Sequence, residues 1–378
     1  MMMPWSKGAK TVRACTIRVL TLGPAKHEKA AIYAVNPRIS NVYRIAGAVL
    51  QRSNSQASAM VQRYKNLELA KHEVQNIRWM LVLHRPKQSV DSSDLRSKSA
   101  DYYQERRFVM AVDFHLHSAF SGDSEAPMEQ MILEGIRRGL RTMCFTEHMD
   151  LDYPEEPGLF EVNTGSYREK FLQMREKYQD QIELLFGIEL GLQPHLAEIH
   201  RSYLNEWPFD FVIGSSHVVH GKDPYYPSFY EGKEEAQAYQ EYFESILENL
   251  AVFDEMDVYG HIDYVVRYGP NKNQYYSYEV YREVLDEILK TLIRKNIGLE
   301  LNTAGYKYGL GHPNPTEAVL KRYAELGGEI LTIGSDGHAP EQLAWDFRKI
   351  PSLLKECGFR YYTVFEERMP VFYPVETF

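Results

Sequence analysis

From residue 110 onwards, short apolar runs alternate with longer stretches of helical periodicity, and this alternation restricts the fold more than any other feature. The apolar runs, which we expect to be strands, cover residues 111–114, 142–146, 182–190, 209–214, 258–260, 298–301 and 329–333. The stretches that we expect to be helices cover residues 127–138, 167–179, 196–204, 234–253, 278–296, 316–326 and 343–355. Repeated strand–helix alternation predicts an α/β fold with a parallel sheet. Such a sheet either closes into a (β/α) barrel or stays open and doubly wound, and periodicity does not separate the two.

Charge divides the chain into two parts. Residues 1–109 carry 19 Lys and Arg against 7 Asp and Glu, a balance of +12. Residues 110–378 carry 24 against 45, a balance of −21, and together these give the net charge of −9. We therefore predict a basic N-terminal extension over 1–109 and an α/β domain over 110–378. The acidic domain does not offer the basic face that nucleic acid needs.

The basic extension has no sustained strand or helix period, and it contains the polar stretch QSVDSSDLRSKSA at 88–100. We predict that it is irregular or poorly ordered. Two origins remain open for it. It is either a targeting segment, for which it is long, or an upstream segment that precedes a true start at Met110.

Cysteine content and hydropathy indicate the compartment. Cys15, Cys144 and Cys357 lie far apart with no CxxC pair, which excludes a disulfide framework and a cysteine zinc site. This usage suits a reducing compartment. No apolar run approaches the roughly 18–20 residues of a membrane-spanning helix. We therefore expect a cytoplasmic protein without a membrane partner.

Residues that bind metals well lie where the predicted strands end. His115 and His117 end the first strand, and Asp336 and His338 follow the last one at the same spacing. Side chains two residues apart on a strand face the same side, so each pair can reach one ion. The intervening strand ends carry further candidates: His148, Glu189, His217 and His261. Because parallel α/β folds form their sites at the carboxyl ends of strands, these side chains are expected to converge. Imidazole and carboxylate donors without thiolates favour Zn, Mn or Fe.

Six short motifs carry these residues: HLHSAFSGD at 115–123, TEH at 146–148, GIE at 187–189, SSH at 215–217, GHID at 260–263 and SDGH at 335–338. Their order and spacing resemble the polymerase and histidinol phosphatase (PHP) superfamily over 110–378. The segments LELNTAG at 299–305 and TIGSDGHAPEQL at 332–343 resemble its histidinol-phosphate phosphatase branch in particular. The resemblance implies a distorted (β/α)7 barrel that hydrolyses L-histidinol phosphate, a step of histidine biosynthesis, by means of a metal-bound hydroxide.

The resemblance also implies three divalent metal ions, of zinc, manganese or iron, and a set of ligands for each. The first ion would be held by His115, His117, Glu189 and Asp336. Glu189 would bridge to the second ion, which His217 and His261 complete. The third would be held by Asp123, His148 and His338, where Asp123 stands in place of a histidine found in some members. Glu189, Asp336 and His217 are the implied catalytic residues.

A phosphate dianion also calls for a fixed cation beside the metals. Arg267, after GHID, and Lys307, after LNTAG, both follow strand ends and are the candidates for binding the substrate phosphate. The sequence contains no G-x-S-x-G elbow and no P-loop, which favours metal-assisted chemistry over a serine nucleophile or nucleotide binding.

Three functions from different classes remain open. The first is a phosphatase acting on L-histidinol phosphate, a small-molecule phosphate monoester. The second is a phosphoesterase acting on nucleotides or nucleic acid. The acidic domain argues against the second. The third is a non-catalytic scaffold stabilised by metals. Such a scaffold would be expected to lack some ligands, whereas every ligand position in this sequence is filled. The oligomeric state is left open.

Overall fold

A computed structural model describes residues 112–378, so the predicted basic extension over 1–109 lies outside the described residues. Seven strands form one sheet in sequence order. Each strand is parallel to the next. The strands are β1 (Val112–Leu116), β2 (Thr142–Met149), β3 (Glu183–Gly191), β4 (Phe211–Ser215), β5 (Val258–Tyr259), β6 (Gly298–Asn302) and β7 (Leu331–Gly334). All seven expected strands are therefore confirmed, with their ends shifted by a few residues.

The sheet closes on itself between β1 and the segment that follows β7. The amide of Asp336 donates to the carbonyl of His115 at 2.7 Å, and the amide of His117 donates to the carbonyl of Gly337 at 2.9 Å. Leu116 and Gly337 form a parallel bridge at the same place. Closure requires Gly334, because a Cβ atom there would lie 2.3 Å from the His115 Cβ. The fold is thus the distorted (β/α)7 barrel, and the open doubly wound alternative is wrong.

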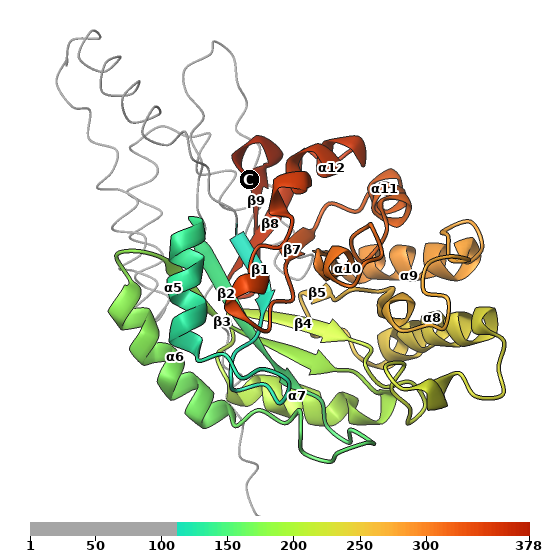
Figure 1. The fold of residues 1–378 in the computed structure, drawn as a ribbon, viewed down its shortest axis with the longest axis horizontal. Coiled ribbons are helices and arrows are strands. Elements are labelled where there is room, and N and C mark those ends of the chain that lie inside the picture. Colours follow the sequence, from blue (N-terminus) through green and yellow to red (C-terminus); the bar gives the residue numbers. More distant parts are fainter. Residues whose placement is uncertain (1–111) are drawn as a thin grey trace, which may run out of the picture. The chain divides into compact units, whose positions relative to one another are not determined.

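Helices surround the barrel on its outside (Figure 1). They are α5 (Met128–Arg138), α6 (Thr164–Tyr178), α7 (Ala197–Glu206), α8 (Glu235–Val252), α9 (Arg282–Lys295), the single turn α10 (Ala304–Lys307), α11 (Glu317–Glu325) and α12 (Ile350–Glu356). Local sequence sets their ends. Gly139 ends α5 in the left-handed region, at φ 81°, and Glu234 begins α8 with a capping box that includes Gln237. The buried residues of α5 recur at helical spacing, which fixes the face that it turns to the sheet.

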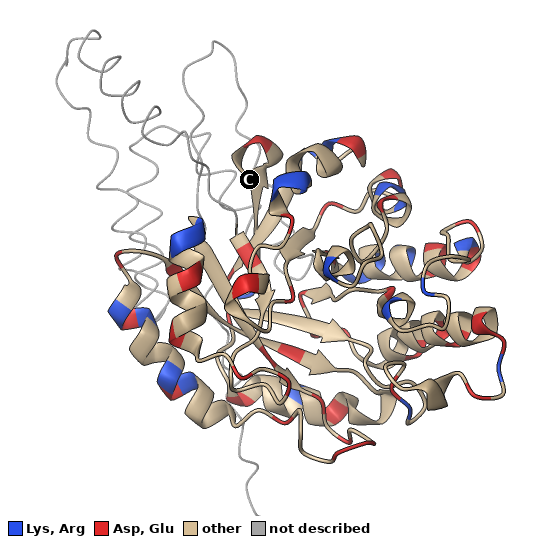
Figure 2. Ribbon diagram, viewed as in Figure 1, with Lys and Arg blue, Asp and Glu red and all other residues tan. Residues whose placement is uncertain are grey.

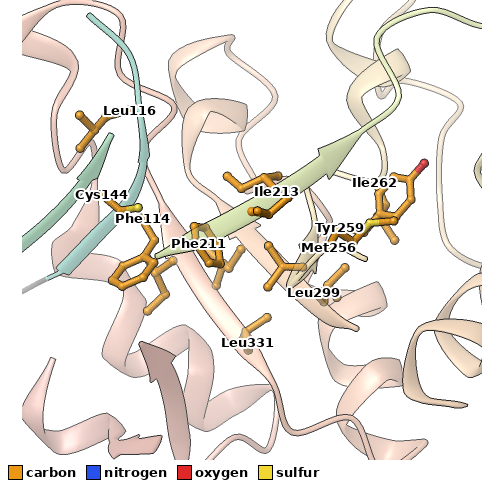
Figure 3. Close-up of a cluster of buried hydrophobic side chains, with 14 of the residues drawn as sticks. Phe114, Leu116, Cys144, Phe211, Ile213, Met256, Tyr259, Ile262, Leu299 and Leu331 are labelled. Carbon is orange, nitrogen blue, oxygen red and sulfur yellow. The ribbon is translucent and has the colours of Figure 1, made fainter. Parts of the chain in front are cut away.

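Large apolar side chains fill the barrel, as Figure 3 shows for Phe114, Phe211, Ile213, Leu299 and Leu331. The rings of Phe114 and Phe211 meet edge to face, with centroids 5.1 Å apart. Full burial of one such side chain contributes about 1.5–3 kcal/mol. The interior of the barrel is therefore a packed core.

A hairpin that the sequence analysis did not predict covers the amino-terminal end of the barrel. Its strands, β8 (Tyr361–Glu366) and β9 (Met369–Pro374), are antiparallel. Phe365 packs against Phe211 at the start of β4, with ring centroids 5.2 Å apart. The amide of Leu331, at the start of β7, donates to the Thr363 hydroxyl at 3.1 Å. Because this end is closed, the carboxyl end is the one available for a site.

The prediction of a helix over 343–355 is wrong in its first half, because α12 begins only at Ile350. Ala344 and Asp346 have positive φ angles of 48° and 57°, which no α-helix accommodates. Tertiary contacts fix this loop: the Ala344 amide donates to Asp113 at 3.1 Å. Long-range hydrogen bonds thus override the local apolar pattern.

Charged residues on the outer helices are mixed in sign (Figure 2). Both signs occur along α5 and α6, and several of the charges pair, such as Arg137 with Glu134 at 2.6 Å. Within residues 112–378, no helix has both the length and the apolar character needed to cross a bilayer.

Candidate metal centre

The histidines and carboxylates singled out above lie together at the carboxyl end of the barrel. β1 carries His115, with His117 just beyond it; β2 carries His148, and β3 carries Glu189. The others follow β4, β5 and β7 directly, apart from Asp123, which lies in the loop between β1 and α5. Parallel pairing brings all the carboxyl ends to one side, and closure of the barrel brings β7 beside β1. Residues more than 200 positions apart therefore share one cavity.

Glu189 lies at the middle of this group and is fully buried. Its Oε2 atom lies 3.1 Å from His115 Nε2 and 3.2 Å from His148 Nδ1. Its Oε1 atom lies 3.1 Å from His261 Nε2 and 3.3 Å from His217 Nε2. The two oxygens of one carboxylate thus face two different sets of imidazoles, which is the arrangement that a bridging ligand requires.

The first predicted ligand set lies together in the buried part of the centre. His115 Nε2 lies 3.1 Å from His117 Nε2. Both nitrogens lie 3.8 Å from Asp336 Oδ1. Two nitrogens that share one tetrahedral zinc at about 2.0–2.1 Å lie roughly 3.4 Å apart, so these separations suit one ion. Asp336 is held at φ 53°, a left-handed conformation that Asp tolerates better than most residues.

The third predicted set lies at the rim. His338 Nε2 is 2.9 Å from Asp123 Oδ2, and His148 Nε2 is 3.7 Å from the same oxygen. The Asp123 side chain is 39% exposed, so this part of the centre is reached from solvent. The His117 ring stacks against His148 and His338, at 4.3 and 4.2 Å, and joins the rim to the buried part.

Some of the donor atoms lack hydrogen-bond partners in the protein, as atoms that bind a divalent cation would. His148 Nδ1 and His338 Nε2 are buried and have no hydrogen-bond partner, although each lies near a carboxylate. Their lone pairs are therefore available to an ion. Burial would raise the pKa of Glu189, but His115 and His217 hold that pKa well below its usual range. The ionised form of the carboxylate is the one that binds a metal.

The opposite nitrogens of three histidines are held by acceptors that the sequence analysis did not identify. The Nδ1 atom of His115 lies 2.6 Å from Glu300, that of His217 lies 2.6 Å from Asp150, and that of His117 lies 3.1 Å from Ser121. Such contacts fix the ring orientation and leave Nε2 free to bind a metal. The three acceptors are thus positioning residues.

One of these acceptors carried a signal in the sequence. His148 and Asp150 repeat the spacing of His115 and His117, so Asp150 could have been identified as a residue facing the same side. Burial opposes ionisation of Asp150, but the charges of His217 and His148 lower its pKa to about 2. In turn, Asp150 and Glu189 outweigh the burial of His217 and raise its pKa to about 10.

We expect Asp150→Asn to weaken zinc binding about tenfold, the lower end of the effect of losing the hydrogen-bond partner of a metal-binding histidine. The amide oxygen still accepts from His217, but the negative charge that increases the basicity of the imidazole is lost. Chelator competition measures the affinity. The matched control is Asp152→Asn, because Asp152 contacts only the exposed His195, at 2.9 Å, in the described structure. An equal loss in both variants would contradict the role of Asp150.

The two candidate phosphate-binding cations differ in their surroundings. Arg267 lines the cavity and donates through Nη1 to Asp336 Oδ2 at 2.8 Å. Its other nitrogens donate to Asn314 and Asn302, at 2.9 and 3.1 Å. Lys307 donates to the Asp336 carbonyl and to Gln342, at 2.9 and 3.0 Å. The surroundings therefore favour Arg267 as the cation that faces a ligand.

The cavity over the centre has a mixed wall of aromatic and charged side chains. Phe160 lies against His148, with ring centroids 5.3 Å apart, and Tyr264 lies 5.3 Å from His217. The remaining wall is formed by residues of the surrounding loops: Tyr153, Asp223, Tyr268 and Tyr308. A small molecule with a flat, apolar part and charged ends would match this wall.

Comparison with known proteins gives consistent relatives. The model of the PHP domain matches residues 113–304. The chain is 32% identical over 253 residues to a histidinol-phosphatase of Lactococcus lactis, covering 66% of this chain and 91% of that protein. It is 31% identical over 260 residues to a probable histidinol-phosphatase of Clostridium acetobutylicum, covering 69% and 98%.

Solved structures agree with the sequence relatives. Histidinol phosphate phosphatase from Lactococcus lactis, crystallised with zinc, L-histidinol and phosphate, has a TM-score of 0.65 at 31% identity. The match covers 69% of this chain and 98% of that structure. A putative histidinol phosphatase from Listeria monocytogenes shares the fold, with a TM-score of 0.56 at 19% identity over 63% of this chain and 99% of that one.

Proposed function

The chain belongs to the PHP domain family, and from this premise we propose that it hydrolyses L-histidinol phosphate to L-histidinol and phosphate. The observation that carries the proposal is the position of Glu189, whose two oxygens face separate groups of imidazoles inside one cavity. The similarity to a phosphatase bound to zinc, L-histidinol and phosphate supports the choice of substrate. We further propose that the reaction serves histidine biosynthesis in the cytoplasm.

Three divalent ions would be held by the residues already described. We propose His115, His117, Glu189 and Asp336 for the first, Glu189, His217 and His261 for the second, and Asp123, His148 and His338 for the third. When bound, such ions supply positive charge to a phosphoryl group and lower the pKa of water, so that hydroxide is available as the nucleophile at neutral pH. Zinc, manganese and iron all suit this set of donors.

The chain's own residues would orient the substrate. Arg267 is fixed by Asp336, Asn302 and Asn314, so its guanidinium requires little reordering when a phosphate binds. The Glu300 and Asp150 carboxylates keep His115 and His217 turned toward the centre. Glu189, Asp336 and His217 are the proposed catalytic residues because they hold the ions that would face the phosphoryl group.

A direct assay tests the proposed function. The full-length protein is stripped of metal, reloaded with zinc or manganese, and supplied with L-histidinol phosphate, p-nitrophenyl phosphate or a short single-stranded DNA. We expect metal-dependent phosphate release, fastest from L-histidinol phosphate. Faster cleavage of the DNA would reject the proposal in favour of a nucleic-acid phosphoesterase. The mixed charge of the outer helices gives that alternative no support.

We also propose that residues 1–109 are dispensable for the reaction. All seven barrel strands, the core and the proposed ligands lie within residues 112–378. A fragment of residues 110–378 is therefore expected to unfold cooperatively and to keep the kcat/KM of the full chain. Circular dichroism and the phosphate-release assay measure both properties. An insoluble fragment, or one with lost turnover, would show that the extension contributes to the domain.

A further inference from the structure

The cavity contains one carboxylate that the proposed metal centre does not use, that of Asp223. This residue lies in the loop between β4 and α8, directly after a tight turn at Val219–Lys222. His220 and Gly221 form the turn with φ angles of 49° and 78°, and the Val219 amide donates to the Lys222 carbonyl at 2.8 Å. Asp223 is only 4% exposed, yet it belongs to the cavity wall. The turn thus presents a buried carboxylate to the space above the metal ligands.

The partners of Asp223 are neutral. The Tyr153 hydroxyl donates to Oδ2 at 2.7 Å, and the Tyr225 amide donates to Oδ1 at 2.7 Å. His217 acts on the carboxylate only through a longer-range attraction. Within residues 112–378, no basic side chain makes a hydrogen bond or ion pair with Asp223.

The other carboxylates of the same wall all have basic neighbours. Asp123 lies 2.9 Å from His338, Asp150 lies 2.6 Å from His217, and Asp336 lies 2.8 Å from Arg267, while Glu189 faces several imidazoles. A buried carboxylate without a cation is costly, and a cationic ligand would remove that cost. Asp223 is therefore a buried carboxylate that a cationic ligand would stabilise.

Aromatic rings beside Asp223 suit the same ligand. Tyr153 meets Phe160 edge to face at 4.7 Å, and Tyr268 meets Tyr264 in the same way at 5.0 Å. The faces of such rings attract a nearby ammonium group and also cover flat apolar surface. Arg267, the candidate for the phosphate end, is bonded to Asp336 and not to Asp223. The guanidinium of Arg267 and the carboxylate of Asp223 thus lie in the same wall without pairing with each other.

We propose that Asp223 binds the ammonium group of the substrate and thereby selects phosphate monoesters whose alcohol carries an amine. The inference rests on the proposed function and adds its specificity determinant. Phosphate would lie toward the metal ligands and Arg267, with the ammonium group at Asp223 and the flat ring between the tyrosines. A charge-assisted hydrogen bond of this kind corresponds to a preference of about ten- to a hundredfold.

The test compares L-histidinol phosphate with its deamino analogue, 3-(imidazol-4-yl)propyl phosphate, on the metal-loaded full-length protein. The readout is the ratio of kcat/KM between the two esters. We expect wild type to favour the amine, and Asp223→Asn to reduce the ratio by about ten- to a hundredfold. Asn preserves the shape and can still accept from the Tyr225 amide, so the loop is expected to keep its conformation. The matched control, Tyr153→Phe, keeps the carboxylate and is expected to retain the preference.

A binding measurement separates this inference from the proposed function. Calorimetry compares L-histidinol with its deamino alcohol on the same proteins. Amine-dependent binding that is lost in Asp223→Asn supports the inference even if wild type hydrolyses neither ester, a result that rejects the proposed function alone. Efficient hydrolysis with an amine preference that survives in Asp223→Asn overturns the inference alone. An equal loss of preference in Tyr153→Phe would also overturn it, because the carboxylate is still present there.

Discussion

Glu189→Gln is expected to abolish turnover and to lower the metal content by more than one ion per chain. Glu189 is the residue that we assign to two ions, because its two oxygens face His115 and His148 on one side and His217 and His261 on the other. Gln has nearly the same shape, but its amide nitrogen cannot bind a metal and its charge is lost. Two neighbouring cations would then repel each other with less compensation, so both sites weaken together.

Metal analysis of the purified variant, with circular dichroism as a check on folding, measures this result. The matched control is His261→Ala, which removes a ligand from the second site alone and is expected to lower the content by about one ion per chain. A folded Gln variant with full metal content and normal turnover would reject the bridging role of Glu189.

Arg267→Ala is expected to raise KM for the phosphate ester about ten- to a hundredfold, with a smaller change in kcat. The guanidinium lines the cavity, and its orientation is fixed by three side chains. Its loss removes a charge-assisted contact that substrate and transition state share. Steady-state kinetics and inhibition by inorganic phosphate both report on that contact.

Two further measurements separate phosphate binding from support of Asp336. Arg267 also neutralises Asp336, so the metal content of the variant must be determined alongside its kinetics. Lys307→Ala is the comparison, since its ammonium donates to Gln342 and to a backbone carbonyl. Unchanged kinetics in both variants would mean that another cation holds the phosphate. Lost metal together with an unchanged KM would assign Arg267 to Asp336 alone.

The sequence by itself determined which segments form strands and which residues lie at the strand ends. Apolar runs bounded by turns specify strands through local burial, and His115 and His117 share a face because side chains alternate on every strand. The same alternation would have found Asp150 beside His148. These features depend on neighbours in the chain, so they can be read without the fold.

The tertiary structure decided what depends on contacts distant in the chain. Whether the sheet closes is settled by the hydrogen bonds between His115 and Asp336, which no local pattern encodes. The loop around Ala344 follows its contact with Asp113 rather than its own helical period. Glu300 and Asp223 have no spacing signal, because each acquires its place only when the barrel closes and a loop folds over its mouth. Local burial and alternation thus determine the elements and the metal-ligand candidates, whereas long-range hydrogen bonds and buried charge decide how they meet.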